Sequence, residues 1–179
     1  MKYSVAFAFF VLASLGVAQP AAAHGPTPQK SNESIVIAVP PAEVWKAVKD
    51  FAKIDGWHPG VAKSVAGGDK ETSITRTLTL KSGGDIVEGL DELDDANLVL
   101  GYRLSKENVD AFPVGSYSAS MKIVAAEGGS EVRWMSRLYR ADTTNEPPPE
   151  KNDEAALKAM SEFFKQGLEG LKKKLESKG

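Results

Sequence analysis

Two oppositely charged side chains interrupt the apolar face of two neighbouring strand-like segments. Arg76 shares a face with the apolar side chains of residues 74–80, and Glu88 lies similarly within residues 86–90. The glycine-containing turn at residues 81–84 joins these segments and should place the two charges opposite or diagonal to each other. Because an isolated charge is costly to bury, the two are expected to pair. The pair could anchor a ligand in a cavity, could be purely structural, or could face water if the register is shifted.

Other hydrogen-bonding side chains are expected on the same face or at its rim. Trp57 and His58, in the irregular segment 56–60, should lie at a cavity mouth, where Trp57 could cover the entrance and His58 could titrate. The alternative is a turn that is packed for shape alone. Four residues alternate with outward positions and should present polar atoms to the cavity wall: Tyr102, Tyr117, Trp134 and Ser136. For Trp134, plain core packing is the competing interpretation.

The composition excludes several kinds of catalytic and metal site. The chain has no cysteine and two histidines, so thiolate sites, disulfides and a three-histidine metal site cannot form within it. The sequence contains no nucleophile elbow and no glycine-rich phosphate loop. We therefore assign no catalytic residue, metal or cofactor, although acid–base chemistry by His58, Glu88 or a tyrosine stays open. A formal net charge of −2 argues against a nucleic-acid partner.

The N-terminus has the layout of a secretory signal peptide. Lys2 precedes an apolar run, Val5 to Val17, which is too short to span a membrane, and small residues follow it up to Ala23. We expect residues 1–23 to be a signal peptide that is cleaved after Ala23. The mature chain should then be periplasmic, with no membrane span, and should begin with a flexible leader at residues 24–32.

The first elements that would position these residues are a strand and two helical segments. Residues 35–39 alternate as a strand, and Pro40-Pro41 ends it. Residues 42–50 then show helical spacing, and a second short helix or turn is expected at residues 51–54. Beyond Val61 the pattern changes to period two and predicts about six antiparallel strands. Their buried face is expected to include Ile74, Leu78, Leu80, Ile86 and Leu90.

One long amphipathic helix is predicted at the C-terminus, from about Asp153 to Ser177. Its apolar residues recur at helical spacing: Leu157, Met160, Phe164, Leu168, Leu171 and Leu175. This helix must cover the buried face of the sheet. The expected fold is therefore α+β, with a curved antiparallel sheet of six or seven strands around the C-terminal helix. An internal cavity, which Phe164 helps to line, should remain between them.

Five short segments resemble the START-like (SRPBCC) helix-grip superfamily, and within it the polyketide cyclase/dehydrase branch. They are Val39–Trp45, Gly56–Val61, Arg76–Leu80, Ile86–Leu90 and Val132–Trp134. The resemblance implies a single START-like domain at residues 33–179. A signal peptide followed by His24-Gly25-Pro26 also resembles exported MxaD-type proteins, which are implicated in electron transfer from methanol dehydrogenase to its cytochrome.

Three functional hypotheses follow. The first is an exported binding or accessory protein whose cavity holds a small hydrophobic or amphipathic ligand, and the subgroup resemblance implies docking on a periplasmic dehydrogenase or cytochrome. The second is a cyclase- or dehydratase-type enzyme that acts on a hydrophobic or aromatic substrate. In the third, cleavage leaves His24 first, and its α-amine and imidazole bind Cu(II), with His58 completing the site. A metal-free leader is the alternative to the third.

Overall fold

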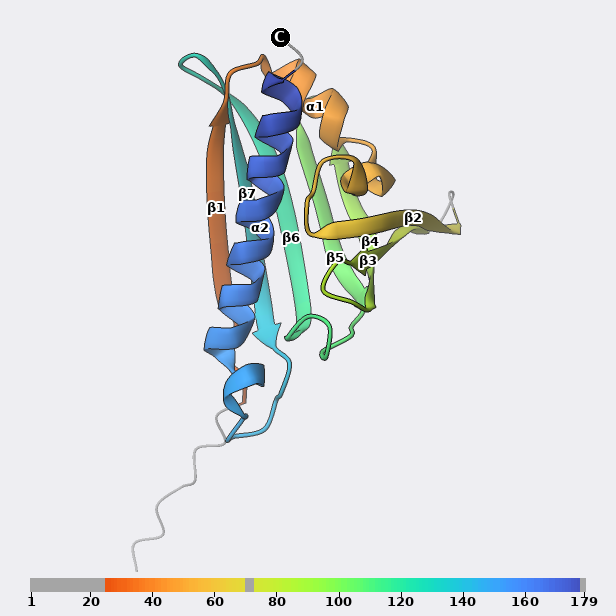
Figure 1. Ribbon diagram of the computed structural model, residues 1–179, viewed down its shortest axis with the longest axis vertical. Helices are drawn as coiled ribbons and strands as arrows, with labels where there is room; N and C mark the ends of the chain where they lie inside the picture. The colour runs from red at the N-terminus through yellow and green to blue at the C-terminus, as the bar shows by residue number, and fades with distance from the viewer. Residues whose placement is uncertain (1–24, 70–72, 178–179) are drawn as a thin grey trace, which may run out of the picture.

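A seven-stranded antiparallel sheet curves around one long helix in the computed structural model, which describes residues 25–69 and 73–177 (Figure 1). Its elements in chain order are β1 (Gln29–Ile37), α1 (Pro41–Val48), η1 (Phe51–Gly56), β2 (Val61–Asp69), β3 (Ser73–Leu80), β4 (Asp85–Asp94), β5 (Val99–Lys106), β6 (Val114–Ala126), β7 (Gly129–Arg140), η2 (Pro149–Lys151) and α2 (Asp153–Glu176). This is the helix-grip, α+β architecture predicted from the sequence.

The strand order places the first and last strands side by side beneath the long helix. Spatially the order is β1-β7-β6-β5-β4-β3-β2, so the first strand pairs with the last, and β2 forms the opposite edge. The helix α2 packs chiefly on β1 and β7, and α1 contacts β6 and β7, whereas η1 contacts β2 and β3 at the other end of the sheet (Figure 1). The face covered by these helices contains the hydrophobic core.

The long helix begins and ends as its sequence predicts. Asn152 caps it, since its side-chain oxygen accepts a hydrogen bond from the main-chain nitrogen of Ala155 at 2.9 Å. Its buried side is formed by Ala156, Met160, Phe164, Gly167, Leu168 and Leu171. Acidic residues occupy its first turn and lysines its last, which complements the helix dipole.

The leader expected at residues 24–32 is shorter than predicted. Gln29 to Asn32 already belong to β1 and pair with residues 138 to 135 of β7. The polar sequence concealed this because only Ser31 of these four residues is buried. His24 and the expected signal peptide lie outside the described residues, as does the copper site proposed at His24.

The buried face of the sheet agrees with the predicted alternation except at its margin. Leu78, Leu80 and Ile86 are buried, whereas Ile74 is 39% exposed and Leu90 is only partly buried. The β2–β3 hairpin extends beyond the helices that cover the sheet (Figure 1). A side chain in this part of β3, such as that of Ile74, can therefore point inward and still be exposed to water.

Candidate functional site

Arg76 and Glu88 face inward and form an ion pair. They are direct cross-strand partners on β3 and β4, and Nε of Arg76 lies 2.5 Å from Oε2 of Glu88. Their side chains are 2% and 1% exposed. Of the three arrangements that the sequence allowed, exposure to water is therefore wrong.

Neighbouring groups form hydrogen bonds with both members of this pair. Nη1 of Arg76 donates to the main-chain oxygen of Phe51 at 2.7 Å, and the hydroxyl of Tyr117 donates to Oε1 of Glu88. The guanidinium carbon also lies 4.1 Å from the centre of the Phe51 ring and 4.9 Å from that of Tyr102. Both carboxylate oxygens are thus engaged, as a buried ion pair requires.

Both inward-facing tyrosines are held in their neutral form. Burial raises the pKa of Tyr102 and that of Tyr117 far above the usual value, and the nearby Glu88 carboxylate adds to both shifts. The hydroxyl of Tyr102 accepts a hydrogen bond from Nε1 of Trp134 at 2.8 Å. Tyr102, Tyr117 and Trp134 therefore form, with Arg76 and Glu88, one buried polar cluster.

His58 ties the turn after η1 to the long helix. Its Nδ1 accepts from the main-chain nitrogen of Gly60 at 3.0 Å, and Nε2 lies 2.9 Å from the main-chain oxygen of Phe163. A carbonyl can only accept, so Nε2 carries the proton and the ring is neutral. Desolvation by burial lowers the pKa of His58 from 6.5 to about 4, and the positive charges of Arg76 and Lys81 act in the same direction. At neutral pH His58 is therefore uncharged, and its two hydrogen bonds connect the turn to α2.

Two glycines of α2 make room for this turn. A Cβ atom on Gly167 would lie 2.6 Å from both His58 Cδ2 and Trp134 Cζ3. One on Gly170 would lie 2.1 Å from the main-chain oxygen of Trp57. Segment 56–60, expected at a cavity mouth, therefore packs into the notch that Gly167 and Gly170 leave in the surface of α2. Trp57 and His58 are accordingly 7% and 1% exposed.

The cavity expected between sheet and helix is largely filled by side chains. The rings of Trp134 and Phe164 stack with centres 4.4 Å apart and planes 12° apart, and both residues are 1% exposed. Trp57, His58 and Phe163 surround the Trp134 ring. Phe164 and Trp134 are thus core residues in this structure, and neither of them lines a surface cleft.

A cleft of about 400 Å³ opens beside this packed interior. It lies between α2, the β3–β4 turn and the β5–β6 loop, and its lining includes Pro59, Gly60, Phe112, Phe163, Ala159 and Gln166. The rings of Phe112 and Phe163 contact each other, with centres 5.8 Å apart. Phe112 also packs against Tyr117, so it separates the cleft from the buried polar cluster.

The segment 56–60, expected at a cavity mouth, contributes Pro59 and Gly60 to this cleft, but the aromatic residues of the cleft, Phe112 and Phe163, were not predicted from the sequence. Phe112 lies in an irregular loop and Phe163 is beside, not on, the main apolar stripe of the helix, so periodicity pointed to neither. The loop is nevertheless ordered by hydrogen bonds from the main-chain nitrogens of Ala111 and Phe112 to the main-chain oxygen of Asn108. The sequence did contain an indication of the cleft. In each of two irregular segments, Trp57-His58-Pro59 and Phe112-Pro113, an aromatic residue lies next to or near a proline.

The sequence of the chain matches one known protein family. The family model described as "Polyketide cyclase / dehydrase and lipid transport" matches residues 28–176, nearly the whole described chain. The chain belongs to this family. No curated protein sequence matches it significantly.

Solved structures show the same fold as this cyclase/dehydrase family member. The Zhui aromatase/cyclase from a Streptomyces species superposes with a TM-score of 0.70 at 16% identity, covering 84% of this chain and 94% of that one. Ara h 8.0201 gives 0.65 at 18% identity, with 84% and 99% covered. A Thermobifida fusca protein gives 0.64 at 24% identity, with 83% and 93% covered.

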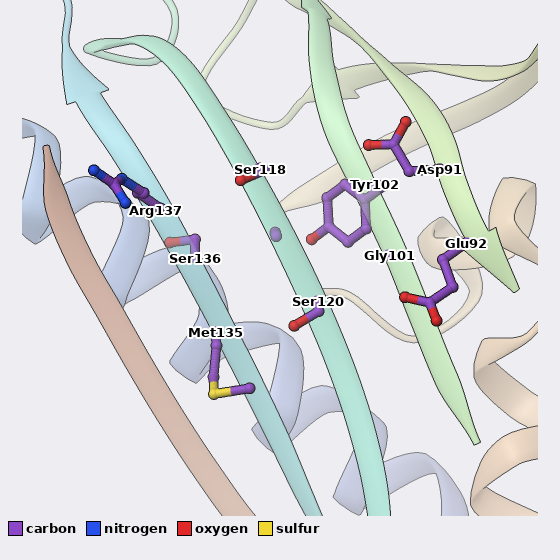
Figure 2. A pocket seen from close by; sticks show the side chains of 10 residues that line it. Asp91, Glu92, Gly101, Tyr102, Ser118, Ser120, Met135, Ser136 and Arg137 are labelled. Carbon is purple, nitrogen blue, oxygen red and sulfur yellow. The ribbon is translucent and has the colours of Figure 1, made fainter. Parts of the chain in front are cut away.

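The outer face of the family member's sheet carries a separate, shallow trough of about 330 Å³. Small residues of the middle strands, Gly101, Ser118 and Ser120, form its floor, while Glu92 and Arg137 lie on opposite sides (Figure 2). The helices lie behind the sheet in this view. The trough is therefore on the other side of the sheet from the candidate site.

Two further observations concern the expected site residues. Within the described part of the chain, the buried Ser136 hydroxyl, the Ser31 hydroxyl opposite it and Nε1 of Trp57 have no hydrogen-bond partner. Ser136 is thus buried as predicted, and together with Tyr102 it also belongs to the lining of the trough.

Residues 25–69 and 73–177 contain neither a group of acidic and histidine side chains suited to a metal ion nor a helix long and apolar enough to cross a membrane.

Proposed function

We propose that this family member binds a small hydrophobic ligand in the cleft between α2, the β3–β4 turn and the β5–β6 loop. The observation that carries the proposal is the aromatic floor of this cleft, Phe112 and Phe163, directly in front of the polar cluster around Glu88. A volume of about 400 Å³ lies within the range of small-molecule sites.

The floor residue Phe112 is the element that should move when a larger ligand enters. It belongs to a loop between β5 and β6, whereas Phe163 belongs to the long helix, which is braced by His58. Displacement of Phe112 would expose the ring of Tyr117 to the cleft, because the two rings are in contact. The ligand would then meet apolar walls and the tyrosine ring, whose hydroxyl is bonded to Glu88.

The geometry favours binding over acid–base catalysis. Both carboxylate oxygens of Glu88 accept hydrogen bonds, and both ring nitrogens of His58 are engaged with main-chain atoms. A general base must lie within hydrogen-bonding reach of the substrate. The Glu88 carboxylate is buried behind Tyr117 and Phe112, away from the cleft. The cyclase-type alternative is therefore supported by the family but not by the geometry of these two groups.

Titration with the fluorescent dye 1-anilinonaphthalene-8-sulfonate tests the proposal. Ala159→Trp should fill the cleft from α2 and weaken dye affinity at least tenfold. Lys158→Trp, at the neighbouring exposed position of the same helix, is the matched control and should leave affinity unchanged. Equal affinity in the two variants would remove the cleft as the binding site.

The place of action is a separate part of the proposal. We propose that the protein works in the periplasm and assists a redox enzyme there by docking on a dehydrogenase or its cytochrome. The support is the sequence of residues 1–23 and the resemblance to MxaD-type proteins. N-terminal sequencing of protein recovered from the cell envelope tests export, and a mature form that keeps Met1 would contradict it.

A further inference from the structure

A second cleft lies at the far end of the concave face, away from α2. It has a volume of about 370 Å³ and is formed by η1 and by β2, β3 and β4. Its lining consists mainly of apolar side chains and glycines: Phe51, Ala52, Ala66, Gly67, Gly68, Ile74, Leu90 and Leu93, with Lys49 and Asp50 at the rim. The proposed function does not use this cleft.

Large apolar side chains remain exposed in this cleft. Ile74 is 39% exposed and Leu93 is 45% exposed, although both lie on the inward face of their strands. Leaving this much aliphatic surface in water is unfavourable by roughly 25 cal/mol per Å². A bound apolar molecule would remove it from water.

The side of the cleft formed by β2 consists of residues with small side chains or none. Ala66, Gly67 and Gly68 follow one another there. Gly68 has φ +74, and a Cβ atom on it would lie 2.0 Å from the main-chain oxygen of Ser73. Glycine is therefore required at this position by the hairpin, and the space beside it cannot be filled by a larger side chain of the strand.

The polar groups at the rim already have partners within the protein. Nζ of Lys49 lies 3.3 Å from Oδ1 of Asp95, and Oδ1 of Asp50 accepts from the main-chain nitrogen of Ala52 at 3.3 Å. The rim thus offers one cation and one anion, each engaged, and no net charge. This arrangement favours an uncharged occupant.

The two clefts are separated by the buried polar cluster. Phe51 forms part of the wall of the second cleft, and its other side packs on the Arg76 guanidinium. Beyond Arg76 come Glu88, Tyr117 and then Phe112, the floor of the first cleft. A molecule in one cleft therefore does not occupy the other.

We propose that the cleft between η1 and β2–β4 is a separate binding site for a neutral apolar molecule of one or two aromatic rings. The occupant packs on Ile74, Leu90 and Leu93 and makes no ion pair. The volume of the cleft, about 370 Å³, is at the lower end of small-molecule pockets and is large enough for one or two aromatic rings.

Toluene, observed through the methyl NMR signals of the ¹³C-labelled protein, is the probe for this site. Addition of toluene should shift the methyl signals of Ile74, Leu90 and Leu93 in a saturable way. Ala66→Trp fills the cleft from β2 and should abolish these shifts. Val65→Trp, at the adjacent position on the opposite face of the same strand, is the matched control and should leave them intact, since Val65 is itself 46% exposed.

Two further measurements make the outcome decisive. Leu93→Asp places a charge in the cleft at an exposed position and should weaken toluene binding at least tenfold while the melting temperature stays within a few degrees. Shifts that persist in Ala66→Trp, or that never saturate, would overturn the proposal. Shifts of the same methyls that depend on protein concentration without toluene would overturn it in favour of a second copy of the chain. Ala159→Trp, which blocks the other cleft, should leave these toluene shifts unchanged whether or not the proposed function holds.

Discussion

Arg76 and Glu88 stand directly opposite each other on β3 and β4, and the 2.5 Å contact between Nε and Oε2 is almost completely removed from water. Phe51 covers the guanidinium on one side, and Tyr117 satisfies the second carboxylate oxygen. The pair thus connects η1, β3, β4 and β6 in the middle of the concave face. Removing either charge would leave the other buried without compensation.

Single substitutions in this pair should be strongly destabilising and the combination much less so. Arg76→Met or Glu88→Leu alone should lower the free energy of unfolding by about 3–5 kcal/mol. The double variant should recover much of this loss, because neither charge remains buried. Adding Tyr117→Phe should recover a further 1 kcal/mol or so, since the tyrosine hydroxyl would otherwise lack an acceptor. Urea unfolding of the series measures these values, and simple additivity of the two single losses would contradict a coupled pair.

His58 should make stability depend on pH in the mildly acidic range. Its pKa is lowered to about 4 in the folded protein from 6.5, so between these values the unfolded chain binds a proton that the folded chain does not. The free energy of unfolding should be undiminished by this group above about pH 6.5 and should fall as pH decreases, by roughly 3 kcal/mol near pH 4. His58→Gln, which does not titrate, should show a flatter profile over this interval. Parallel pH profiles of the two proteins would show that His58 is not held neutral.

Alanine at the two notch glycines should destabilise the protein, the reverse of its usual effect in a helix. Gly→Ala normally adds about 0.5–1 kcal/mol inside a helix. At Gly167 and Gly170, however, the new methyl would meet Trp134, His58 and the main-chain oxygen of Trp57 at 2.1–2.6 Å. We expect a loss of about 1–3 kcal/mol in thermal or urea unfolding. The exposed Glu169→Ala, between the two glycines, should change stability by less than about 0.5 kcal/mol.

Phe164→Ala separates a core role from a ligand-lining role. Because Phe164 stacks on Trp134 and is 1% exposed, its truncation should cost about 3–5 kcal/mol of unfolding free energy. Dye affinity at the α2 cleft should be nearly unchanged, since Phe164 does not line that cleft. A small loss of stability together with a large change in dye affinity would show instead that Phe164 lines a ligand cavity.

The sequence by itself determined the order of elements, the helix that packs on the sheet and the placement of Arg76 and Glu88 on one face of neighbouring strands. These features follow from local rules: apolar residues at steps of three and four in α2, alternation along the strands, and the glycine turn that sets the β3–β4 register. The same rules placed Tyr102, Tyr117, Trp134 and Ser136 on the concave face, where all four are buried.

Only the tertiary structure decided whether that face encloses a cavity or a packed core. The outcome depends on distances between segments far apart in sequence, such as Trp134 against Phe164 and His58 against Gly167, and these have no local periodic signal. It also depends on how far the helices extend over the sheet, which leaves Ile74 exposed although its strand position faces inward. Side-chain direction is a property of the strand, whereas burial is a property of what packs against it.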